Sequence, residues 1–503
     1  MKKIILALTG IISLTASYGQ DISDALRYST DNTQGTARFK AMSGAFGALG
    51  GDMSGVSVNP AGSALFNLSH GSLSLSNNSV SNDVGYSGSS TKENKDNFDL
   101  NQIGAAFIFK NKDQASLWNK FVLSVFYEQL DNYNNNFLAA GASSNSIGSY
   151  FTEYANGLRL DEISAYPGES ISDAYSNIGS GYGSRFQQAY LGYESYILEP
   201  GSENDDNTVY TSNIASGNFD QEYYYSSTGY NGKFSVNAGF QYDKNIYFGM
   251  TLNSHFVDYE RSTYLYEENS NEGSTTNQVD FENNLLTTGE GFSLQLGTIF
   301  KLNDAFRVGL TYDSPTWITL RDETNQYIST VNDTENTRTV VNPNVINLFE
   351  DYKIQTPAKI TGSAAYIIGE TGLISIDYSR KDYSKTKFKP ESEIGFSQQN
   401  TLISNSLKAA DTFRIGGELR HQKYSFRGGY KMEQSPYSDT SVYGDLKGFS
   451  LGLGYNFGNT RLDLAYENSK RETDYQLYNA GTLGAAQINA TNTNVSITLS
   501  MNL

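Results

Sequence analysis

The side chains that could carry acid–base or nucleophilic chemistry are few and widely separated in this sequence. The three histidines, His70, His255 and His421, lie too far apart along the chain to form a motif. The sequence contains no G-x-S-x-G nucleophile elbow and no H-E-x-x-H zinc helix. It also contains no cysteine, which excludes disulfide bonds and thiolate metal sites. We therefore expect a protein that is not an enzyme and that has no cofactor and no metal site.

Cationic side chains form a second group of candidates, because they recur in segments where apolar and polar residues alternate. They share the polar side of that alternation with the carboxylates of Asp377 and Glu418. One interpretation is a ladder of ion pairs, and the sharper one is a set of contacts to the carboxylate head group of a ligand. The cations concerned are Arg307, Arg414, Arg427 and Lys431.

The alternation predicts the elements that position these residues. In the last segment Val495, Ile497 and Leu499 alternate with Ser496 and Thr498, and a period of two places successive side chains on opposite faces of a strand. Fourteen such segments are predicted as strands, near 71–80, 101–110, 119–130, 233–243, 245–258, 289–302, 305–320, 357–368, 372–383, 411–420, 423–433, 447–457, 460–469 and 494–503.

The connections between these segments alternate between short and long. Short turns such as 303–304 and 458–459 alternate along the chain with long loops such as 321–356 and 470–493, and the longest loop is 131–232. Short periplasmic turns, long extracellular loops and an even number of strands are typical of single-chain bacterial barrels. We therefore predict an all-β fold, a fourteen-stranded antiparallel transmembrane β-barrel over 69–503 in the outer membrane of a Gram-negative bacterium.

The composition excludes two other classes of protein. With 36 Lys and Arg against 54 Asp and Glu, the formal net charge is −18, whereas binding to nucleic acid needs basic residues that neutralise phosphates. The 37 Tyr and 27 Phe are too many aromatic residues for an acidic disordered chain.

The first residues predict export. Lys2 and Lys3 precede an apolar stretch at 4–14, and Ser17 and Gly19 fit a cleavage site that would make 1–19 a signal peptide. The apolar stretch is too short for a membrane-spanning helix, which needs about 20 residues. The partners expected from export to this membrane are outer-membrane lipid and the machinery that assembles barrels.

The segment 20–68 is predicted to plug the barrel as an N-terminal hatch. Barrels of sixteen or more strands leave an aqueous channel, so we expect a lumen of fourteen strands to leak unless it is filled. This segment lacks strand alternation and is rich in small residues that permit close packing. Those residues are Gly44, Ala45, Gly47, Ala48, Gly50, Gly51, Gly55, Ala61 and Gly62.

The same segment resembles the hatch of the FadL/TodX family of outer-membrane transporters for long-chain fatty acids and other hydrophobic compounds. The resemblance rests on Ala37-Arg38, Ala41-Met42-Ser43-Gly44-Ala45-Phe46, Gly51-Asp52 and Asn59-Pro60-Ala61-Gly62. It implies passive uptake of a hydrophobic small molecule that is captured at the extracellular loops and released when the hatch moves. The terminal Leu503 and the very long loop 131–232 depart from the family pattern.

Two alternatives remain from other functional classes. Some barrels of this family in Bacteroidetes-type bacteria, the members that this chain resembles, serve a protein-secretion machinery as shuttles, so a secreted protein is a second candidate cargo. The other alternative is a general diffusion porin, against which the expected plug argues.

The longest loop contains aromatic and aliphatic residues at helical spacing, Tyr150, Phe151, Tyr154 and Leu158. They are expected either to cover the core of the loop itself or to form a hydrophobic patch at the cell surface. In the same loop Glu203, Asp205 and Asp206 lack the full spacing of a calcium-binding EF-hand.

Overall fold

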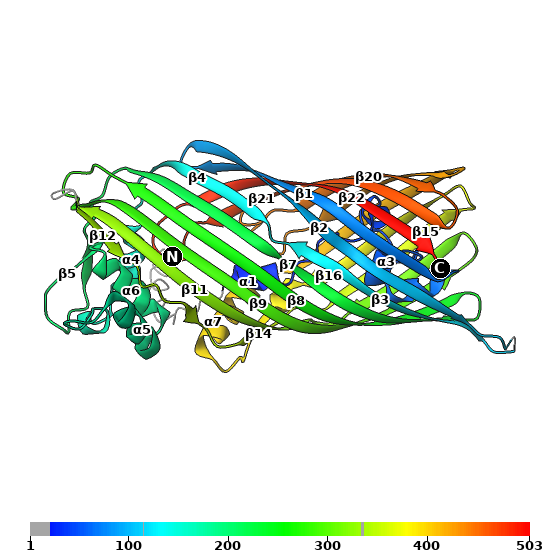
Figure 1. Cartoon of the computed structure of the whole chain (residues 1–503), viewed down its shortest axis with the longest axis horizontal. Helices are drawn as coiled ribbons and strands as arrows, with labels where there is room; N and C mark the ends of the chain where they lie inside the picture. The colour runs from blue at the N-terminus through cyan, green and yellow to red at the C-terminus, as the bar shows by residue number, and fades with distance from the viewer. Residues whose placement is uncertain (1–20, 114, 333–336) are drawn as a thin grey trace, which may run out of the picture.

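The computed structural model describes residues 21–113, 115–332 and 337–503, so the predicted signal peptide lies outside the described residues. Its main feature is a long β-barrel, drawn with the barrel axis horizontal in Figure 1. Fourteen antiparallel strands close the barrel, because the first strand, β1, pairs with the second, β2, on one side and with the last, β22, on the other. The predicted fold is confirmed.

The barrel strands follow one another in chain order around the ring, each paired with its neighbours. They are β1 (His70–Tyr86), β2 (Ser89–Lys110), β3 (Trp118–Asn132), β7 (Phe219–Tyr242), β8 (Ile246–Glu268), β9 (Thr276–Lys301), β10 (Phe306–Asp313), β15 (Lys359–Ile368), β16 (Gly372–Asp382), β18 (Ala409–His421), β19 (Tyr424–Glu433), β20 (Leu446–Asn456), β21 (Thr460–Gln476) and β22 (Ala485–Asn502).

Further strands raise the wall at the long-loop end. They are β4 (Asn135–Ser143), β11 (Trp317–Asn332), β12 (Thr337–Val341), β13 (Asn347–Leu348), β14 (Tyr352–Gln355) and β17 (Lys387–Lys389). A separate two-stranded sheet joins β5 (Leu198–Pro200) to β6 (Tyr210–Ser212).

The outer surface of the barrel carries an apolar band with aromatic residues at both borders. Leu310 and Leu451 are each 56% exposed although they are aliphatic. Near the short turns Trp118 contacts Phe240, with ring centroids 6.1 Å apart, while Phe413 contacts Tyr378 at the opposite border, 5.0 Å apart. Bands of this kind, flanked by aromatic girdles, face lipid in outer-membrane barrels.

Several strands extend further toward the long loops than the sequence predicted. The segment 81–100, expected as a loop, belongs to the β1–β2 hairpin, whose strands pair as far as Tyr86 and Ser89. Beyond the apolar band the outward side chains turn polar, as at Asp258 and Glu260 of β8, which are exposed. Apolar alternation ends there because neither face of the wall meets lipid, and the prediction therefore stopped too early.

Short helices of the N-terminal segment lie inside the barrel (Figure 1). They are α1 (Ile22–Arg27), α2 (Ala37–Lys40), α3 (Met53–Val58) and the 3₁₀ helix η1 (Pro60–Leu65). Each begins at a residue whose side chain accepts hydrogen bonds from the first backbone N–H groups, namely Asp21, Thr36, Asp52 and Asn59. Such caps let very short helices form where propensity alone would not.

A helical lobe stands beside the mouth of the barrel at the long-loop end (Figure 1). It consists of α4 (Gly148–Ala155), η2 (Leu160–Glu162), α5 (Ile171–Tyr182) and α6 (Ser184–Glu194), while η3 (Tyr383–Lys385) and α7 (Ile394–Ser406) belong to another loop. Among the described residues, no helix combines the length and the apolar character needed to cross a membrane.

Candidate functional site: the plugged lumen and the cavity above it

The barrel wall makes room for the hatch with inward-facing glycines. A Cβ atom on any of these glycines would come within 3.0 Å of a hatch atom. At such positions hatch atoms, from backbone or side chain, lie directly against the backbone of the wall, which only glycine permits. The glycines and their hatch neighbours are Gly239 at Ser63, Gly249 at Pro60, Gly297 at Asn59, Gly309 at Gly47, Gly416 and Gly429 at Met42, and Gly452 at Ala41.

Polar side chains of both parts tie the hatch to the wall. The Asp377 carboxylate accepts hydrogen bonds from the backbone N–H groups of Phe46, at 2.9 Å, and Gly47, at 3.0 Å. The Asn59 side-chain amide donates to the carbonyl oxygen of Thr298 in β9 at 3.1 Å and also to that of Gly47. Thus Asn59 of the Asn-Pro-Ala-Gly run both caps η1 and anchors it to the wall.

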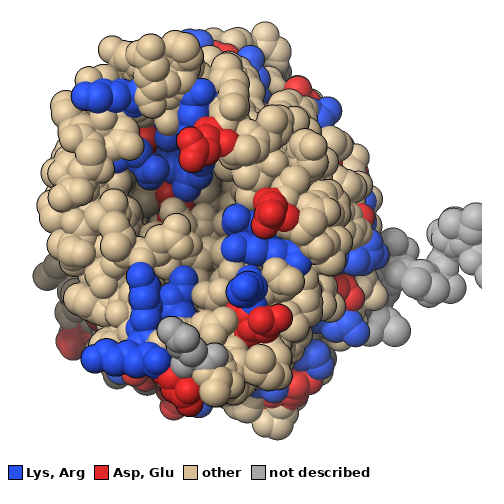
Figure 2. Space-filling view, turned by 90° about the vertical axis from the view of Figure 1, so that its right-hand side faces the viewer, with Lys and Arg blue, Asp and Glu red and all other residues tan. Residues whose placement is uncertain are grey.

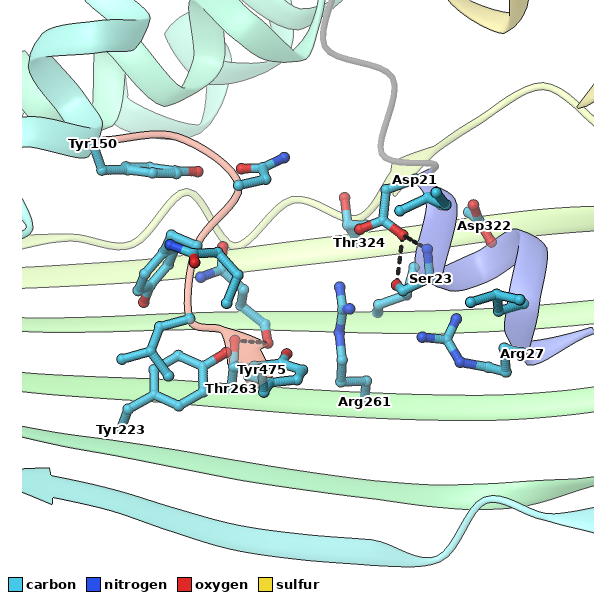
Figure 3. Close-up of a pocket in the computed structure, with 18 of the residues that line it drawn as sticks. Asp21, Ser23, Arg27, Tyr150, Tyr223, Arg261, Thr263, Asp322, Thr324 and Tyr475 are labelled. Carbon is cyan, nitrogen blue, oxygen red and sulfur yellow. Dashed lines mark hydrogen bonds between the residues drawn. The ribbon is translucent and has the colours of Figure 1, made fainter. Parts of the chain in front are cut away.

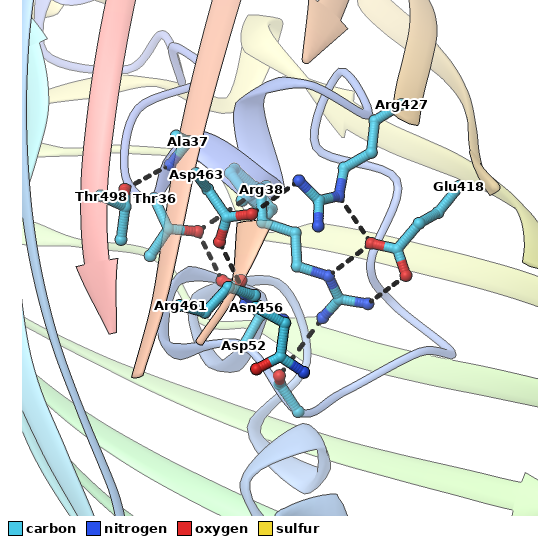
Figure 4. A network of polar contacts seen from close by, with 12 residues as sticks. Thr36, Ala37, Arg38, Asp52, Glu418, Arg427, Asn456, Arg461, Asp463 and Thr498 are labelled. Carbon is cyan, nitrogen blue, oxygen red and sulfur yellow. Dashed lines mark hydrogen bonds and ion pairs between the residues drawn. The ribbon is translucent and has the colours of Figure 1, made fainter. Parts of the chain in front are cut away.

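An ion-pair network joins the hatch to three wall strands (Figure 4). The Arg38 guanidinium of α2 contacts the Glu418 carboxylate at 2.9 Å, and Arg427 contacts the same carboxylate at 2.6 Å. Arg427 also reaches Asp463 at 2.7 Å, and Asp463 in turn accepts from Arg461. These charges are nearly all buried, and removing one member of such a set costs about 3–5 kcal/mol because its partners stay buried without compensation.

Asp52, the second charged residue of the hatch run, has a local role. Its carboxylate accepts hydrogen bonds from the Thr36 hydroxyl at 2.7 Å and from the backbone N–H of Ser54 at 3.0 Å. It therefore fixes the beginnings of α2 and α3 relative to each other. The structure thus brings all the hatch residues named from the sequence into one buried body, in which Ala61 and Gly62 lie within η1.

Above this body, a cavity of about 650 Å³ opens toward the long loops (Figure 3). The N-terminal helix α1 contributes Ile22, Leu26 and Arg27 to it, and the lobe contributes Tyr150 and Tyr154. The remaining apolar and aromatic side chains come from the raised wall and its loops, namely Tyr223, Leu285, Phe349, Tyr437, Val442, Tyr443, Tyr475, Leu477 and Tyr478. Polar side chains, among them Asp322, Gln326 and Asp474, share the lining. The size and the mixed lining are those of a site for a small molecule with both apolar and polar parts.

Two arginines point into this cavity, Arg27 from α1 and Arg261 from β8 (Figure 3). Arg27 forms an ion pair with Asp24 and lies over the Tyr259 ring, 4.1 Å from its centroid. The guanidinium of Arg261 in β8 has no hydrogen bond and no ion pair within the described ranges. Burial and the neighbouring Asp21 raise the pKa of Asp24 to about 6. Its carboxyl group is therefore protonated when the pH falls slightly below neutral.

Smaller cavities continue from the mouth past the hatch segment 27–34. One of about 320 Å³ is lined by polar side chains that include Lys40, Lys431 and Glu467, and another of about 120 Å³ reaches Glu128 and His255. The space below the mouth is therefore much more polar than the cavity above it.

The four cations predicted from the sequence lie apart from the mouth cavity. Arg307 donates to the Leu49 carbonyl oxygen of the hatch at 2.9 Å, and Arg427 belongs to the network in Figure 4. Lys431 is paired with Glu467 at 2.6 Å, and the guanidinium of Arg414 lies 3.7 Å from Glu433. Three of these cations therefore have carboxylate partners and Arg307 a carbonyl oxygen, while contact with a ligand head group stays a prediction.

The sequence pattern missed the two cavity arginines. Arg261 follows Tyr259 on the inward face of β8, and continuing the count of alternate residues past 258 would have found it. No pattern in the sequence identified Arg27, because it lies in a helix of only six residues, too short to show a periodicity.

The loop residues predicted as a possible surface patch are buried instead. Phe151 is fully buried, and Tyr150 and Leu158 are each 6% exposed within a core shared by the lobe and the rim of the barrel. Tyr154 packs against that core and also lines the cavity. The exposed-patch interpretation is therefore corrected: helix α4 turns these side chains toward the barrel and forms a cavity wall.

Solved structures share this fold at low sequence identity, whereas no protein-family model and no curated protein matches the sequence. The toluene transporter TodX of Pseudomonas putida matches with a TM-score of 0.53 and 12% identity, over 94% of this chain and 99% of that chain. A FadL homologue of Pseudomonas aeruginosa matches with a TM-score of 0.51 and 11% identity, over the same shares. The chain therefore has the fold of these outer-membrane barrels, with fourteen antiparallel strands closed around an N-terminal plug.

Proposed function

We propose that this protein takes up hydrophobic compounds passively across the outer membrane and that the mouth cavity is its first binding site. The observation that carries this proposal is the cavity of about 650 Å³ between the lobe, the raised wall and the hatch helix α1. Outward residues at this height, such as Asp258 and Glu260, are polar and exposed. The cavity therefore stands outside the hydrocarbon layer, where it can take an apolar molecule from the cell surface.

The route inward involves the hatch, whose parts are held very differently. The body at 36–66 is held by wall glycines, by Asp377 and by the Arg38–Glu418 pair. The segment 21–34 borders all four cavities and is tied to the wall by side-chain pairs at their edges, such as Asp31 with Lys359 at 2.9 Å and Asn32 with Asp131 at 2.6 Å. We infer that release begins with a shift of 21–34, driven by the concentration gradient and by differential affinity for the two hatch positions.

The two arginines extend the proposal to the ligand. A guanidinium without a carboxylate partner is suited to a carboxylate head group, so Arg261, with Arg27 beside it, favours long-chain fatty acids over hydrocarbons. The name of one solved relative, a toluene transporter, keeps neutral aromatic hydrocarbons as the other ligand class.

The test is transfer of oleate and of toluene through purified protein in liposomes. Replacing Arg261→Met should slow oleate transfer about tenfold, the loss expected for one charge-assisted hydrogen bond, and should leave toluene transfer unchanged. Arg321→Met is the matched control, because Arg321 is exposed on the outer wall and pairs with Asp351. Wild-type protein that speeds neither compound would overturn the proposed function, and equal slowing of both would overturn the role of Arg261.

A protein-secretion shuttle is the second candidate function. The polar lining of the lower cavities favours it, since an apolar ligand gains nothing there. A secreted protein that copurifies stoichiometrically, together with failed oleate and toluene transfer, would support this candidate. The diffusion porin is disfavoured, because the body of the hatch fills the lumen of the barrel.

A further inference from the structure

Four cationic side chains face the lumen at the short-turn end of the barrel, below the hatch. They are Lys110 of β2, Lys120 of β3, Lys301 of β9 and Arg307 of β10. The Lys120 ammonium donates to the Phe66 carbonyl oxygen at 2.7 Å, and Arg307 donates to that of Leu49. The Lys301 ammonium lies 5.0 Å from the centroid of the inward Tyr247 ring. Lys110 follows Ala106 and Ile108, which pack against the hatch, on the same face of β2.

The four cations form two pairs of direct neighbours on adjacent strands. In the strand register Lys110 is the direct partner of Lys120, and Lys301 is the direct partner of Arg307. Like charges opposite one another across a strand pair are destabilising. Within the described ranges, none of the four forms an ion pair with a carboxylate, and the Arg307 Nε is buried with no hydrogen-bond partner.

Other cations at the same rim do have carboxylate partners. Arg420 and Arg461, also at the short-turn end, pair with Glu418 and Asp463 at 2.5 and 2.7 Å. Moreover, the chain has 54 acidic residues against 36 basic ones. A group of four inward cations without a carboxylate is therefore a specific local feature and not a consequence of composition.

The view of this end in Figure 2 shows many Lys and Arg side chains around a hollow, with Asp and Glu side chains beside some of them. The tips of the turns differ from the hollow, because they carry both signs, with Lys112 beside Asp113 and Lys244 beside Asp243. A protein that docked across the tips would meet mixed charge. A small anion inside the mouth would meet these four cations, whereas the Glu418 and Asp463 carboxylates of the same rim are already paired with arginines.

We propose that Lys110, Lys120, Lys301 and Arg307 form an anion site at the periplasmic mouth, which binds the negatively charged head group of an amphiphile as it leaves beneath the hatch. This proposal rests on the proposed function and deepens it. An anion there competes with the Phe66 and Leu49 carbonyls for the donors of Lys120 and Arg307. Binding of the anion and loosening of the hatch are therefore linked, each favouring the other.

The site can be tested in the full-length protein in neutral detergent by pulsed acetylation of lysines, read out by peptide mass spectrometry. Dodecanoate below its micellar concentration should lower the acetylation rates of Lys110, Lys120 and Lys301 about threefold, as expected when about two-thirds of the sites are occupied. Lys112 and Lys244, at the turn tips of the same rim, are the internal controls and should not change.

Further probes distinguish the possible ligands, and dodecanol matches dodecanoate in chain length. Equal protection by dodecanol would overturn the proposal, because the contact would then be apolar. Equal protection by inorganic sulfate would reject the amphiphile and leave a site for free anions. Protection by polyglutamate alone would assign the surface to an acidic protein. Unchanged rates with dodecanoate would remove the site altogether.

A double variant separates this site from the uptake function. Lys110→Gln with Lys301→Gln should slow the release of dodecanoate on the periplasmic side severalfold and leave toluene transfer unchanged. Lys112→Gln with Lys244→Gln is the matched control pair. Failure of wild-type transfer would count against the proposed function, whereas normal dodecanoate release by the Lys110/Lys301 variant would count against the anion site alone.

Discussion

Single glycines of the wall decide whether the hatch can be seated, and Gly297 of β9 tests this most directly. A Cβ atom there would lie within 3.0 Å of Asn59 and Pro60. Gly297→Ala should leave the barrel folded, destabilise hatch docking by about 1–3 kcal/mol, as overpacking does, and raise the ionic conductance of the protein in planar bilayers. Gly362→Ala is the control, because its Cβ would meet nothing within 4 Å. Conductance that stays at the wild-type level would contradict a seat made by glycines.

The titration of Asp24 predicts how ligand affinity depends on pH. Burial and Asp21 raise its pKa to about 6, while Arg27 and Arg261 act in the opposite direction. Above this pKa the carboxylate is charged and engages Arg27, and below it the carboxyl is neutral and the Arg27 charge is available to a ligand. An alkyl sulfonate, ionised throughout, should therefore bind about three- to tenfold more tightly at pH 5 than at pH 7.

Calorimetric titration of the sulfonate at the two pH values measures this effect. Asp24→Asn should bind with the higher affinity at both. A pH dependence that persists in this variant would assign the titration to another group.

At the scale of residues, the sequence predicted the hatch better than the cavity. Arg38, Asp52 and Asn59 could be named because they occur in one short run that resembles a known hatch. Their partners, Glu418 and Thr298, could not be assigned to them, because each pairing joins residues more than two hundred positions apart. Arg27 and Arg261 meet only after the barrel has closed.

Among the elements, the strands inside the membrane were predictable and those above it were not. All fourteen predicted strands correspond to barrel strands, because lipid on one side and polar lumen on the other impose strict alternation. Above the lipid both faces of β8 and β21 meet polar surroundings or protein, so hydrophobicity no longer reports the period. For this reason the sequence pattern did not predict the raised wall. That part of the barrel carries Tyr223, Arg261 and Tyr475 of the cavity.

The lobe between β4 and β7 can be removed without breaking a barrel strand. Ser143 of β4 and Phe219 of β7 are direct partners, so an Asn-Gly turn that replaces 144–218 can close the hairpin. The cavity would lose Tyr150, Tyr154 and the two glutamines of α6. Affinity for oleate should fall at least about tenfold, since a buried aromatic side chain contributes more than 1 kcal/mol.

Fluorescence titration with a labelled fatty acid measures the affinity, and heat-modifiable electrophoretic mobility reports an intact barrel. Tyr166→Ala is the control, because that lobe tyrosine is 67% exposed and lies away from the cavity lining. Unchanged affinity in the truncated barrel would place the binding site below the mouth.

Taken as a whole, the molecule separates its charge between inside and outside. The net charge is −18, yet cations predominate among wall side chains that face the lumen below the mouth. These cations include Lys110, Lys120, Lys233, Lys301, Arg307, Lys359, Lys381, Arg414, Arg420, Arg427, Lys431, Arg461 and Arg471, and the carboxylates include Glu128, Asp131, Asp313, Asp377, Glu418, Glu433, Asp463 and Glu467.

Removing the hatch should expose this charge to ions. Deletion of 21–66 leaves every barrel strand intact and takes away the body that fills the lumen, so large steady conductance should replace the small conductance of the wild type. Because rings of Lys and Arg select anions, the reversal potential in a KCl gradient should show anion selectivity despite the acidic chain. A cation-selective pore would mean that the acidic loops, and not the lumen, control permeation. A variant that stays closed would mean that the loops alone can seal the barrel.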